Sequence, residues 1–386
     1  MRKMKTLLPA FILFLTSSCT SHEEPYHFQQ AEALSPYAQA SFEQYVVETQ
    51  NWMKAERNFL TDNQELEIAL NSPQEYQPQQ SNGEAILLVH GLGDSPYSFN
   101  DIATHLSDKG YLVRTMLLPG HGSKVGDLKL VTADIWQESV EHQIKLLQQQ
   151  SDQVWLGGYS TGANLVTSYA LTDDSIKGLI LYSPAFNGSS ELLPMAKYAQ
   201  YVMEWADQDP ETNYLRYDSL PMTAAASYYE TTQRVQQKLA STPSYNKPVF
   251  MLISEGDTVV DKDFAVDQFA TRFSHPSSQL VWLGNNPPLK ERTVAYNMKL
   301  PELKISEGSH MGGLFSPNNP EYGVNGKNRL CNNGQGAELE AQCLAGAEVW
   351  YSSYGYVETG KIHARLTYNP YFDESLARME EVLSVH

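Results

Sequence analysis

The chain of 386 residues combines 41% hydrophobic residues with a formal net charge of −18 at pH 7. So many apolar residues can fill a large core, which excludes a disordered or fibrous protein. The negative charge argues against binding to nucleic acid or anionic bilayers, and it favours neutral or cationic small molecules as substrates.

The first nineteen residues have the pattern of a signal peptide. Three basic residues within positions 2–5 are followed by an apolar run over 7–15, which is too short to span a bilayer. The stretch LTSSC, which ends at Cys19, resembles the signal of bacterial lipoproteins, in which the cysteine is lipidated. The resemblance implies export and an anchor at the outer membrane through Cys19. An ordinary cleaved signal, giving a periplasmic or secreted protein, is the alternative.

Residues 20–80 are predicted to form an extension and linker ahead of the main domain, 81–386. Apolar residues at helical spacing predict one helix over 42–53. The stretch LEIAL, residues 66–70, predicts a short strand, and the polar stretch 71–84 is typical of a linker. We expect this extension to pack against the main domain and to take no part in chemistry.

From residue 85 onward, apolar strands alternate with helices. The stretch AILLVHG is an almost continuous apolar run, as expected of a strand that is covered on both faces. This alternation predicts an α/β fold, with a mainly parallel sheet, right-handed crossovers and helices on both faces. The predicted strands are 85–91, 111–122 with its turn, 153–160, 176–185 and 247–257, and the predicted helices are 98–110, 134–150, 162–172, 263–273 and 375–385.

Three segments interrupt the alternation. Residues 187–246 are rich in aromatic residues and compatible with helices, and they directly follow a predicted strand. They are therefore predicted to form a cap over the carboxyl edge of the sheet. Residues 285–303 form a shorter insertion, and residues 311–362 form an insertion that is rich in glycine and loops.

Two cysteines, Cys331 and Cys343, remain once Cys19 is assigned to the signal. In an exported chain, two cysteines twelve positions apart predict a disulfide, and two buried thiols are the alternative. Closing so short a loop contributes about 3 kcal/mol in the chain-entropy account.

The stretch GGYSTG carries the pattern G-x-S-x-G between a predicted strand and a predicted helix, with Gly158, Ser160 and Gly162 at its fixed positions. In that context the serine lies on a strained turn that presents its hydroxyl above the sheet. Glycines flank it because any side chain there would collide with neighbouring backbone. Ser160 is the candidate nucleophile, and a serine that only caps the helix is the alternative.

A serine hydroxyl needs a base to activate it, and the base needs an acid to orient it. Asp257 directly ends an apolar strand and is the candidate acid. Its rivals are Glu255 and Asp261, of which the latter is better explained as the cap of the next helix. His310 lies in a glycine-rich loop and is the candidate base, with His363 as the second choice.

The oxyanion formed on attack needs fixed hydrogen-bond donors. The backbone amides of Leu92, in the loop LVHGLGDS, and of Thr161 are predicted to converge above Ser160. Two histidines nearby are predicted to be structural: His90 should pack or hydrogen-bond beneath this loop, and His121 should stabilise the turn in PGHG.

The stretches VHGLGDSP, LLPGHGS, DIW, GGYSTG, SEGDTVVD and SEGSH, between residues 89 and 310, resemble the α/β-hydrolases, in the branch of the monoacylglycerol lipases and bacterial carboxylesterases. The resemblance implies the same nucleophile, acid, base and oxyanion donors as above. It also implies esterase or lipase activity, no cofactor or metal, and a helical cap that shapes the acyl site.

The predicted reaction is a two-step acyl transfer on a small, neutral and hydrophobic carboxylic ester. The cap offers apolar side chains for an acyl or aryl group, namely Met203, Trp205, Met222, Tyr228 and Tyr229, although these could equally pack the cap onto the body. Peptide or thioester hydrolysis on the same scaffold, or a non-catalytic envelope binding protein, are the alternatives. No nucleic-acid partner is expected, and contact with a membrane is expected only through the lipid anchor.

Overall fold

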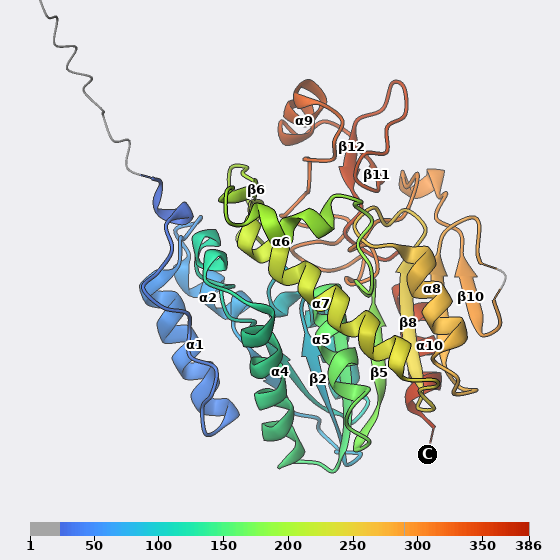
Figure 1. Ribbon diagram of the computed structural model, residues 1–386. Helices are drawn as coiled ribbons and strands as arrows, with labels where there is room; N and C mark the ends of the chain where they lie inside the picture. Colours follow the sequence, from blue (N-terminus) through green and yellow to red (C-terminus); the bar gives the residue numbers. More distant parts are fainter. Residues whose placement is uncertain (1–23, 289, 386) are drawn as a thin grey trace, which may run out of the picture.

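The computed structural model describes residues 24–288 and 290–385 (Figure 1). Cys19 and the predicted signal peptide lie outside the described residues. Within those ranges, no helix is both long enough and apolar enough to pass through a bilayer.

An eight-stranded sheet forms the centre of the molecule, in the order β1-β3-β2-β4-β5-β8-β9-β10. All neighbouring strands are parallel except β1, which runs antiparallel to β3 at one edge. The mainly parallel sheet predicted from the alternation is thus confirmed. The strands are β1 (Gln74–Tyr76), β2 (Glu84–Val89), β3 (Leu112–Met116), β4 (Gln153–Tyr159), β5 (Ile176–Tyr182), β8 (Val249–Ser254), β9 (Gln279–Leu283) and β10 (Thr293–Tyr296).

Helices cover both faces of the sheet, each face with its own apolar core. One core includes Trp136 and Phe269, and the other includes Ile102 and Met379, all of them fully buried. Because both faces are covered, the central strands are apolar throughout, and all six residues of β8 are buried. The first face carries α4 (Ala133–Gln148), α5 (Thr161–Ala170) and α8 (Lys262–Thr271), and the second carries α3 (Asn100–Asp108) and α10 (Phe372–Leu383).

The N-terminal extension contains two helices, α1 (Phe42–Glu56) and α2 (Gln64–Asn71). The helix predicted over 42–53 is confirmed as part of α1, but the strand predicted over 66–70 is wrong because these residues lie within α2. Five residues alternating as L-E-I-A-L fit a helix as well as a strand. Asn63 favours the helix, since its side chain accepts a hydrogen bond from the amide of Leu66 and so caps the helix.

Arg57, at the end of α1, fastens the extension to the main domain. Its guanidinium forms a buried ion pair with Glu67, with Nε and Oε2 3.0 Å apart. The same side chain donates hydrogen bonds to the carbonyls of Gly122 and Tyr214, at 2.5 and 2.6 Å. One arginine thus connects the extension, the loop after β3 and the segment that leads into β7.

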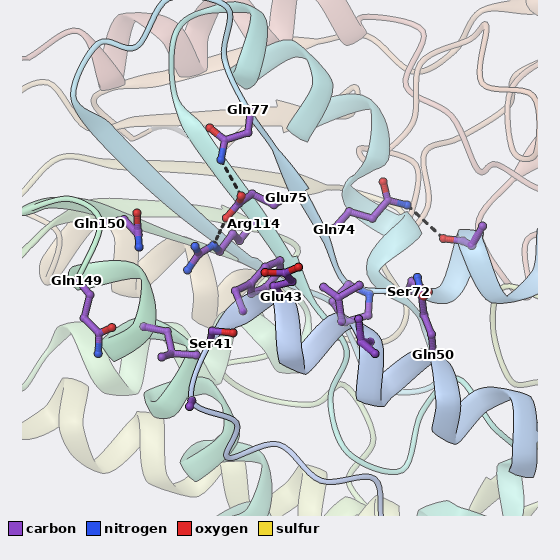
Figure 2. A pocket seen from close by; sticks show the side chains of 17 residues that line it. Ser41, Glu43, Gln50, Ser72, Gln74, Glu75, Gln77, Arg114, Gln149 and Gln150 are labelled. Carbon is purple, nitrogen blue, oxygen red and sulfur yellow. Dashed lines mark hydrogen bonds and ion pairs between the residues drawn. The ribbon is translucent and has the colours of Figure 1, made fainter.

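A groove of about 680 Å³ lies where α1 meets the edge of the sheet (Figure 2). Arg114 of β3 lines it, with Nε 2.6 Å from Glu75 of β1 and the guanidinium 4.5 Å from the ring centre of Phe42. These contacts hold the antiparallel edge strand between α1 and the parallel body.

Residues 187–246, which we call the cap segment, leave the sheet after β5. They contain the one-turn helix α6 (Ala196–Ala199), the short strands β6 (Trp205–Asp207) and β7 (Leu220–Pro221), and the long helix α7 (Met222–Ser241). The helical pattern in MAKYAQYVMEWA therefore yields only one helical turn. Its apolar side chains find too little to pack against, and Tyr201 and Val202 are 82% and 85% exposed.

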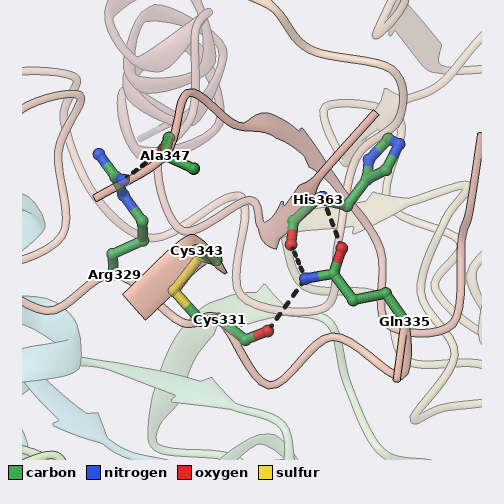
Figure 3. The surroundings of a disulfide bond; sticks show 6 residues. All are labelled: Arg329, Cys331, Gln335, Cys343, Ala347 and His363. Atoms are coloured by element: carbon green, nitrogen blue, oxygen red, sulfur yellow. Dashed lines mark hydrogen bonds between the residues drawn. A yellow bond between two sulfur atoms is a disulfide. The ribbon is translucent and has the colours of Figure 1, made fainter. Parts of the chain in front are cut away.

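Residues 311–369, which we call the disulfide segment, are mostly loop. Cys331 and Cys343 are joined by a disulfide in this segment (Figure 3). Gln335 links the disulfide loop to the small sheet, because its side chain donates to the carbonyl of Cys331 and accepts from the amide of His363. The elements here are α9 (Ala337–Leu344), β11 (Trp350–Ser352) and β12 (His363–Arg365). Figure 1 shows them at the same end of the molecule as α6 and β6.

Candidate active site

Ser160 lies in the turn between β4 and α5. Its backbone has φ 53° and ψ −115°, a conformation that residues with a side chain rarely adopt and that costs about 1–3 kcal/mol. The turn is held by the Ser160 amide, which donates to the carbonyl of Tyr182 at 3.1 Å, and by the Ser160 carbonyl, which accepts from Ala185. The strained turn places the Ser160 side chain in a cavity of about 370 Å³.

The two glycines beside Ser160 allow the turn to pack closely. A β-carbon at Gly158 would lie 2.5 Å from the amide nitrogen of Ala163, and one at Gly162 would lie 2.1 Å from the carbonyl oxygen of Val89. Both contacts are with backbone, which cannot move aside. The close approach predicted from the G-x-S-x-G pattern is therefore present at both positions.

The three side chains predicted as nucleophile, base and acid meet at the carboxyl ends of the strands. His310 Nε2 is 3.1 Å from Ser160 Oγ, and His310 Nδ1 is 2.7 Å from Asp257 Oδ2. Asp257 is fully buried, and its other oxygen accepts hydrogen bonds from the amides of Val259 and Val260. With Nδ1 donating to the carboxylate, Nε2 is free to accept the serine proton.

Two serines that the sequence reasoning missed hold the histidine loop. Ser183, directly after β5, has φ 39°, and its hydroxyl donates to the carbonyl of His310 at 2.9 Å. Ser309 donates in the same way to the carbonyl of Leu366. The rings of Tyr159 and His310 also pack, with centroids 5.0 Å apart. A serine at the carboxyl end of a predicted strand was the available signal for Ser183.

The rival acids and the rival base have other contacts. Asp261 caps α8 by accepting from the amide of Phe264, as predicted. Burial would raise the pKa of Glu255, but hydrogen bonds from Asn286 outweigh it and lower that pKa. His363 lies in β12 beside the disulfide and does not line the cavity that contains Ser160 (Figure 3).

The amides predicted as oxyanion donors belong to residues that line the same cavity. Leu92 and Thr161 are neighbours of Ser160 there, and neither amide donates a hydrogen bond to any residue that the structure describes. The loop around Leu92 is fixed at Gly93, whose amide donates to His121 Nε2 at 3.0 Å and whose carbonyl accepts from the amide of Tyr217 at 2.7 Å.

The two histidines below this loop are structural, as predicted. His90 Nε2 accepts a hydrogen bond from the amide of Leu118, while its Nδ1 donates to the carbonyl of Gly91. His121 uses Nδ1 toward the carbonyl of Leu118 and Nε2 as the acceptor for Gly93. Burial lowers the pKa of His121 to about 4 and lowers that of His90 well below its usual range. Both rings are therefore neutral near pH 7, in the form that accepts the loop amides.

The cavity beside Ser160 has an apolar part and a charged part. Of the five cap residues predicted to contact an acyl group, only Tyr228 lines it. Trp205 instead packs against Phe28, with ring centroids 4.9 Å apart. The other apolar lining residues are Leu92, Leu220, Val259 and Met311, and the charged lining residues are Asp94, Asp207, Arg216, Asp218 and Arg365. The sequence reasoning missed all five charged residues, because no local motif marks them.

Metal ligation finds no support in the described part of the chain. Among those residues, no group of three or more histidine, cysteine, aspartate or glutamate side chains is arranged to hold a metal ion.

Comparison with known proteins relates the chain to lipases and esterases. The thermostable monoacylglycerol lipase of a Bacillus species is 26% identical over 184 residues, which cover 45% of this chain and 71% of the lipase. The 2-succinyl-6-hydroxy-2,4-cyclohexadiene-1-carboxylate synthase of Pectobacterium atrosepticum is 23% identical over 241 residues, which cover 60% of this chain and 88% of the synthase.

Solved structures include similar chains. A metagenome-derived lipolytic enzyme matches with a TM-score of 0.49 and 20% identity, over 55% of this chain and 87% of that one. The monoacylglycerol lipase of Paleococcus ferrophilus matches with a TM-score of 0.44 and 19% identity, over 54% of this chain and 87% of that one. A family model described as serine aminopeptidase, S33, matches residues 80–284, which is just over half of the chain. The chain therefore belongs to this family of hydrolases, within the α/β-hydrolase superfamily.

Proposed function

We propose that this protein is a serine hydrolase that cleaves carboxylic esters through an acyl-enzyme formed on Ser160. The observation that carries the proposal is the continuous contact from Asp257 through His310 to Ser160, at 2.7 and 3.1 Å. A strained serine turn alone would not indicate catalysis. Joined to a buried carboxylate through an imidazole, it has the three parts that nucleophilic catalysis by a hydroxyl requires.

Acylation begins when Ser160 Oγ attacks the ester carbonyl while its proton passes to His310 Nε2. The bond from Oγ to carbon forms, and the carbonyl electron pair moves onto oxygen, which the amides of Leu92 and Thr161 stabilise. The bond to the leaving alcohol then breaks, and His310 returns its proton to that alcohol. Water repeats the sequence in place of serine, releasing the acid and restoring the hydroxyl.

Asp257 contributes by holding the charged imidazole that forms during each step. Its carboxylate is buried, and two backbone amides fix its orientation, so no solvent reorganisation accompanies the charge transfer. The imidazole thereby stays in the tautomer that accepts the serine proton.

The substrate is proposed to present a hydrophobic acyl or aryl group to the apolar part of the cavity. A volume of about 370 Å³ suits a small ester or a medium acyl chain. The Bacillus relative is a monoacylglycerol lipase, whose name indicates an ester substrate with an acyl chain.

A labelling experiment tests the nucleophile. A fluorophosphonate probe should modify the wild-type protein and fail to modify the Ser160→Ala variant. Ser175→Ala, at an exposed serine in the loop before β5, is the matched control and should label like wild type. Equal labelling of wild type and Ser160→Ala would refute the proposed nucleophile.

A substrate panel tests the reaction class. Purified protein is offered p-nitrophenyl esters, acyl-thioesters and aminoacyl anilides, and we expect the esters to have the highest kcat/KM. Release from anilides without ester turnover would instead favour a peptidase, the activity named in the description of the family model.

For localisation, we propose that Cys19 is lipidated and anchors the protein in the envelope. The basic start, the short apolar run and the sequence LTSSC support this. Mass spectrometry of the mature N-terminus tests it: a diacylglyceryl group on Cys19 is expected, and an unmodified peptide beginning at another residue would reject the anchor.

A further inference from the structure

Two arginines line the cavity that contains Ser160 and His310. Arg216 lies in the cap segment shortly before β7, and Arg365 is the last residue of β12 in the disulfide segment. Among the residues that the structure describes, no carboxylate oxygen lies within 4.0 Å of either guanidinium, although five guanidinium–carboxylate pairs occur elsewhere. Two guanidiniums that contact no acid in one small cavity would stabilise an added anion there.

Arg365 is the less compensated of the two. Its Nη2 donates to the carbonyl of Asn332 at 2.8 Å, and its guanidinium lies 5.1 Å from the ring centre of Tyr354. Its Nε is buried and has no hydrogen-bond partner among the described residues. Burial, followed by repulsion from Arg216, lowers the pKa of Arg365 to about 10. It stays charged near neutral pH, held in a place where a negative group would be stabilised.

The aspartates in the lining do not replace that negative group. Asp218 accepts hydrogen bonds from the amide and hydroxyl of Thr212, and Asp207 is exposed at the rim. Asp94 faces Arg216 from beyond ion-pair distance, and burial raises its pKa. Although burial opposes it, Asp94 and Asp218 raise the pKa of Arg216. Asp218 also acts on Arg365, but burial and repulsion from Arg216 outweigh it and lower the pKa of Arg365. Room for one more anion therefore remains on the Arg365 side.

A third possible donor lies elsewhere in the lining of the same cavity. The hydroxyl of Tyr228, on α7, belongs to the cavity lining, is buried, and has no hydrogen-bond partner among the described residues. Buried polar groups in folded proteins are nearly always paired, and a bound ligand is one common explanation for an unpaired one. Three groups that can donate hydrogen bonds thus border a cavity that also holds the nucleophile.

We propose that the substrate is an ester that carries a free carboxylate, bound by Arg365 and Arg216 while its carbonyl lies over Ser160. The planar guanidinium matches a carboxylate in a bidentate arrangement and remains charged at all relevant pH values. This proposal rests on the proposed esterase function and specifies its substrate class. It also revises the expectation of a neutral substrate, which came from the charge of the whole chain and not from the charge beside the serine.

The test compares matched ester pairs. The first pair is p-nitrophenyl hemiglutarate and p-nitrophenyl pentanoate, which differ by a carboxylate on the acyl side. The second pair is the butyrate ester of 4-hydroxybenzoic acid and phenyl butyrate, which differ on the alcohol side. In wild type, kcat/KM for the anionic member of at least one pair should exceed that of the neutral member by roughly 10-fold or more.

Substitutions then assign the effect to the arginines. Arg365→Gln should lower the ratio of anionic to neutral kcat/KM by roughly 10- to 100-fold, and Arg216→Gln should lower it by a smaller factor. Arg365→Lys keeps the charge and should restore part of the ratio. The control is Arg329→Gln, in the same segment, whose side chain donates to the carbonyl of Ala347 (Figure 3) and lies outside the cavity lining. It should leave the ratio unchanged.

A binding measurement separates this proposal from the proposed function. Calorimetry with Ser160→Ala should detect 5-phenylpentanoate and should detect the corresponding amide at least 10-fold more weakly. Carboxylate binding that is lost in Ser160→Ala/Arg365→Gln would support the anion site even if no ester were hydrolysed. Neutral esters preferred in both pairs, or equal binding of acid and amide, would overturn the proposal while leaving Ser160 as a labelled nucleophile.

Discussion

The carboxyl ends of the sheet strands and the two insertions around them, the cap segment and the disulfide segment, contribute to the cavity in different ways. Ser160 and Asp257 lie in short turns directly after strands, and His310 lies in a loop packed on the sheet. Hydrogen bonds to backbone atoms hold all three. Arg216 and Arg365 come from the cap segment and the disulfide segment, far from each other in the chain. Under the proposed function, this difference assigns bond cleavage to the sheet and the choice of substrate to the insertions.

The largest effect on kcat should come from a substitution at the end of a sheet strand. Ser160→Ala removes the nucleophile, so we expect kcat for the best ester to fall by about 10⁵- to 10⁶-fold. Steady-state and single-turnover rates with p-nitrophenyl esters measure it. The exposed Ser175→Ala should keep wild-type kcat, and a loss of less than 100-fold in Ser160→Ala would show that another group does the chemistry.

Asp257→Asn should lower kcat by about 10⁴-fold, because an amide can stabilise the wrong imidazole tautomer and cannot balance the imidazolium charge. The matched change is Asp261→Asn, four residues further along the chain. Asp261 caps α8 and accepts a hydrogen bond from the side chain of Asn187, so this variant should keep its activity and lose about 1–2 kcal/mol of unfolding free energy. If both variants lost activity alike, the assignment of Asp257 as the acid would be wrong.

The loop beneath the oxyanion donors should be sensitive to pH. Folding lowers the pKa of His121 from 6.5 to about 4, so the neutral ring stabilises the fold above pH 6.5, and that stability is lost as the pH falls toward 4. Between pH 7 and 4.5 the contribution is about 2–3 kcal/mol of unfolding free energy. Urea unfolding at both pH values measures it.

His121→Phe provides the control for this pH dependence. It removes the titrating group, so the loss of stability between pH 7 and 4.5 should be smaller than in wild type. It also removes the acceptor of the Gly93 amide, and kcat should fall by about 10-fold because the Leu92 amide is then poorly placed. Identical pH dependence in variant and wild type would exclude His121 as its source.

The smallest effect on bond cleavage should come from the disulfide segment. Replacing Cys331 and Cys343 by serine opens the loop between them and should lower the unfolding free energy by about 2–4 kcal/mol. Labelling of Ser160 should persist, while the preference for anionic esters should weaken because Arg365 lies in the same segment. Reducing agent should reproduce the change in wild type and have no effect on the variant.

Sequence reasoning worked where a local pattern has one physical solution. A serine between glycines after an apolar strand can adopt only the tight turn found at Ser160, and an aspartate at the end of a buried strand lies at the same edge of the sheet. The helix α2 was mistaken for a strand because five residues are too few to separate the two periodicities. Its cap, Asn63, was the signal that would have corrected it.

The two arginines that line the cavity could not be predicted in the same way. Arg216 and Arg365 are brought together by packing between insertions whose internal order depends on tertiary contacts. The aromatic stretch around Met203 gives the opposite error: the sequence predicts that it offers an acyl pocket, but the stretch lies largely exposed on the cap segment. Periodicity reports which side of an element is buried, and it carries no information on which cavity a side chain reaches.

The three contacts of Arg57 have a practical consequence for protein engineering. This residue precedes the portion shared with the family model, yet it binds carbonyls of two loops within that portion. A recombinant chain that begins at residue 80, where the shared portion starts, would lack Arg57. The two carbonyls would lose this donor, and the stretch that bears Arg216 would be held less firmly. A start chosen by homology would keep Ser160, Asp257 and His310 in the chain, but the stretch that bears Arg216, and with it the proposed discrimination among substrates, would lose its anchor.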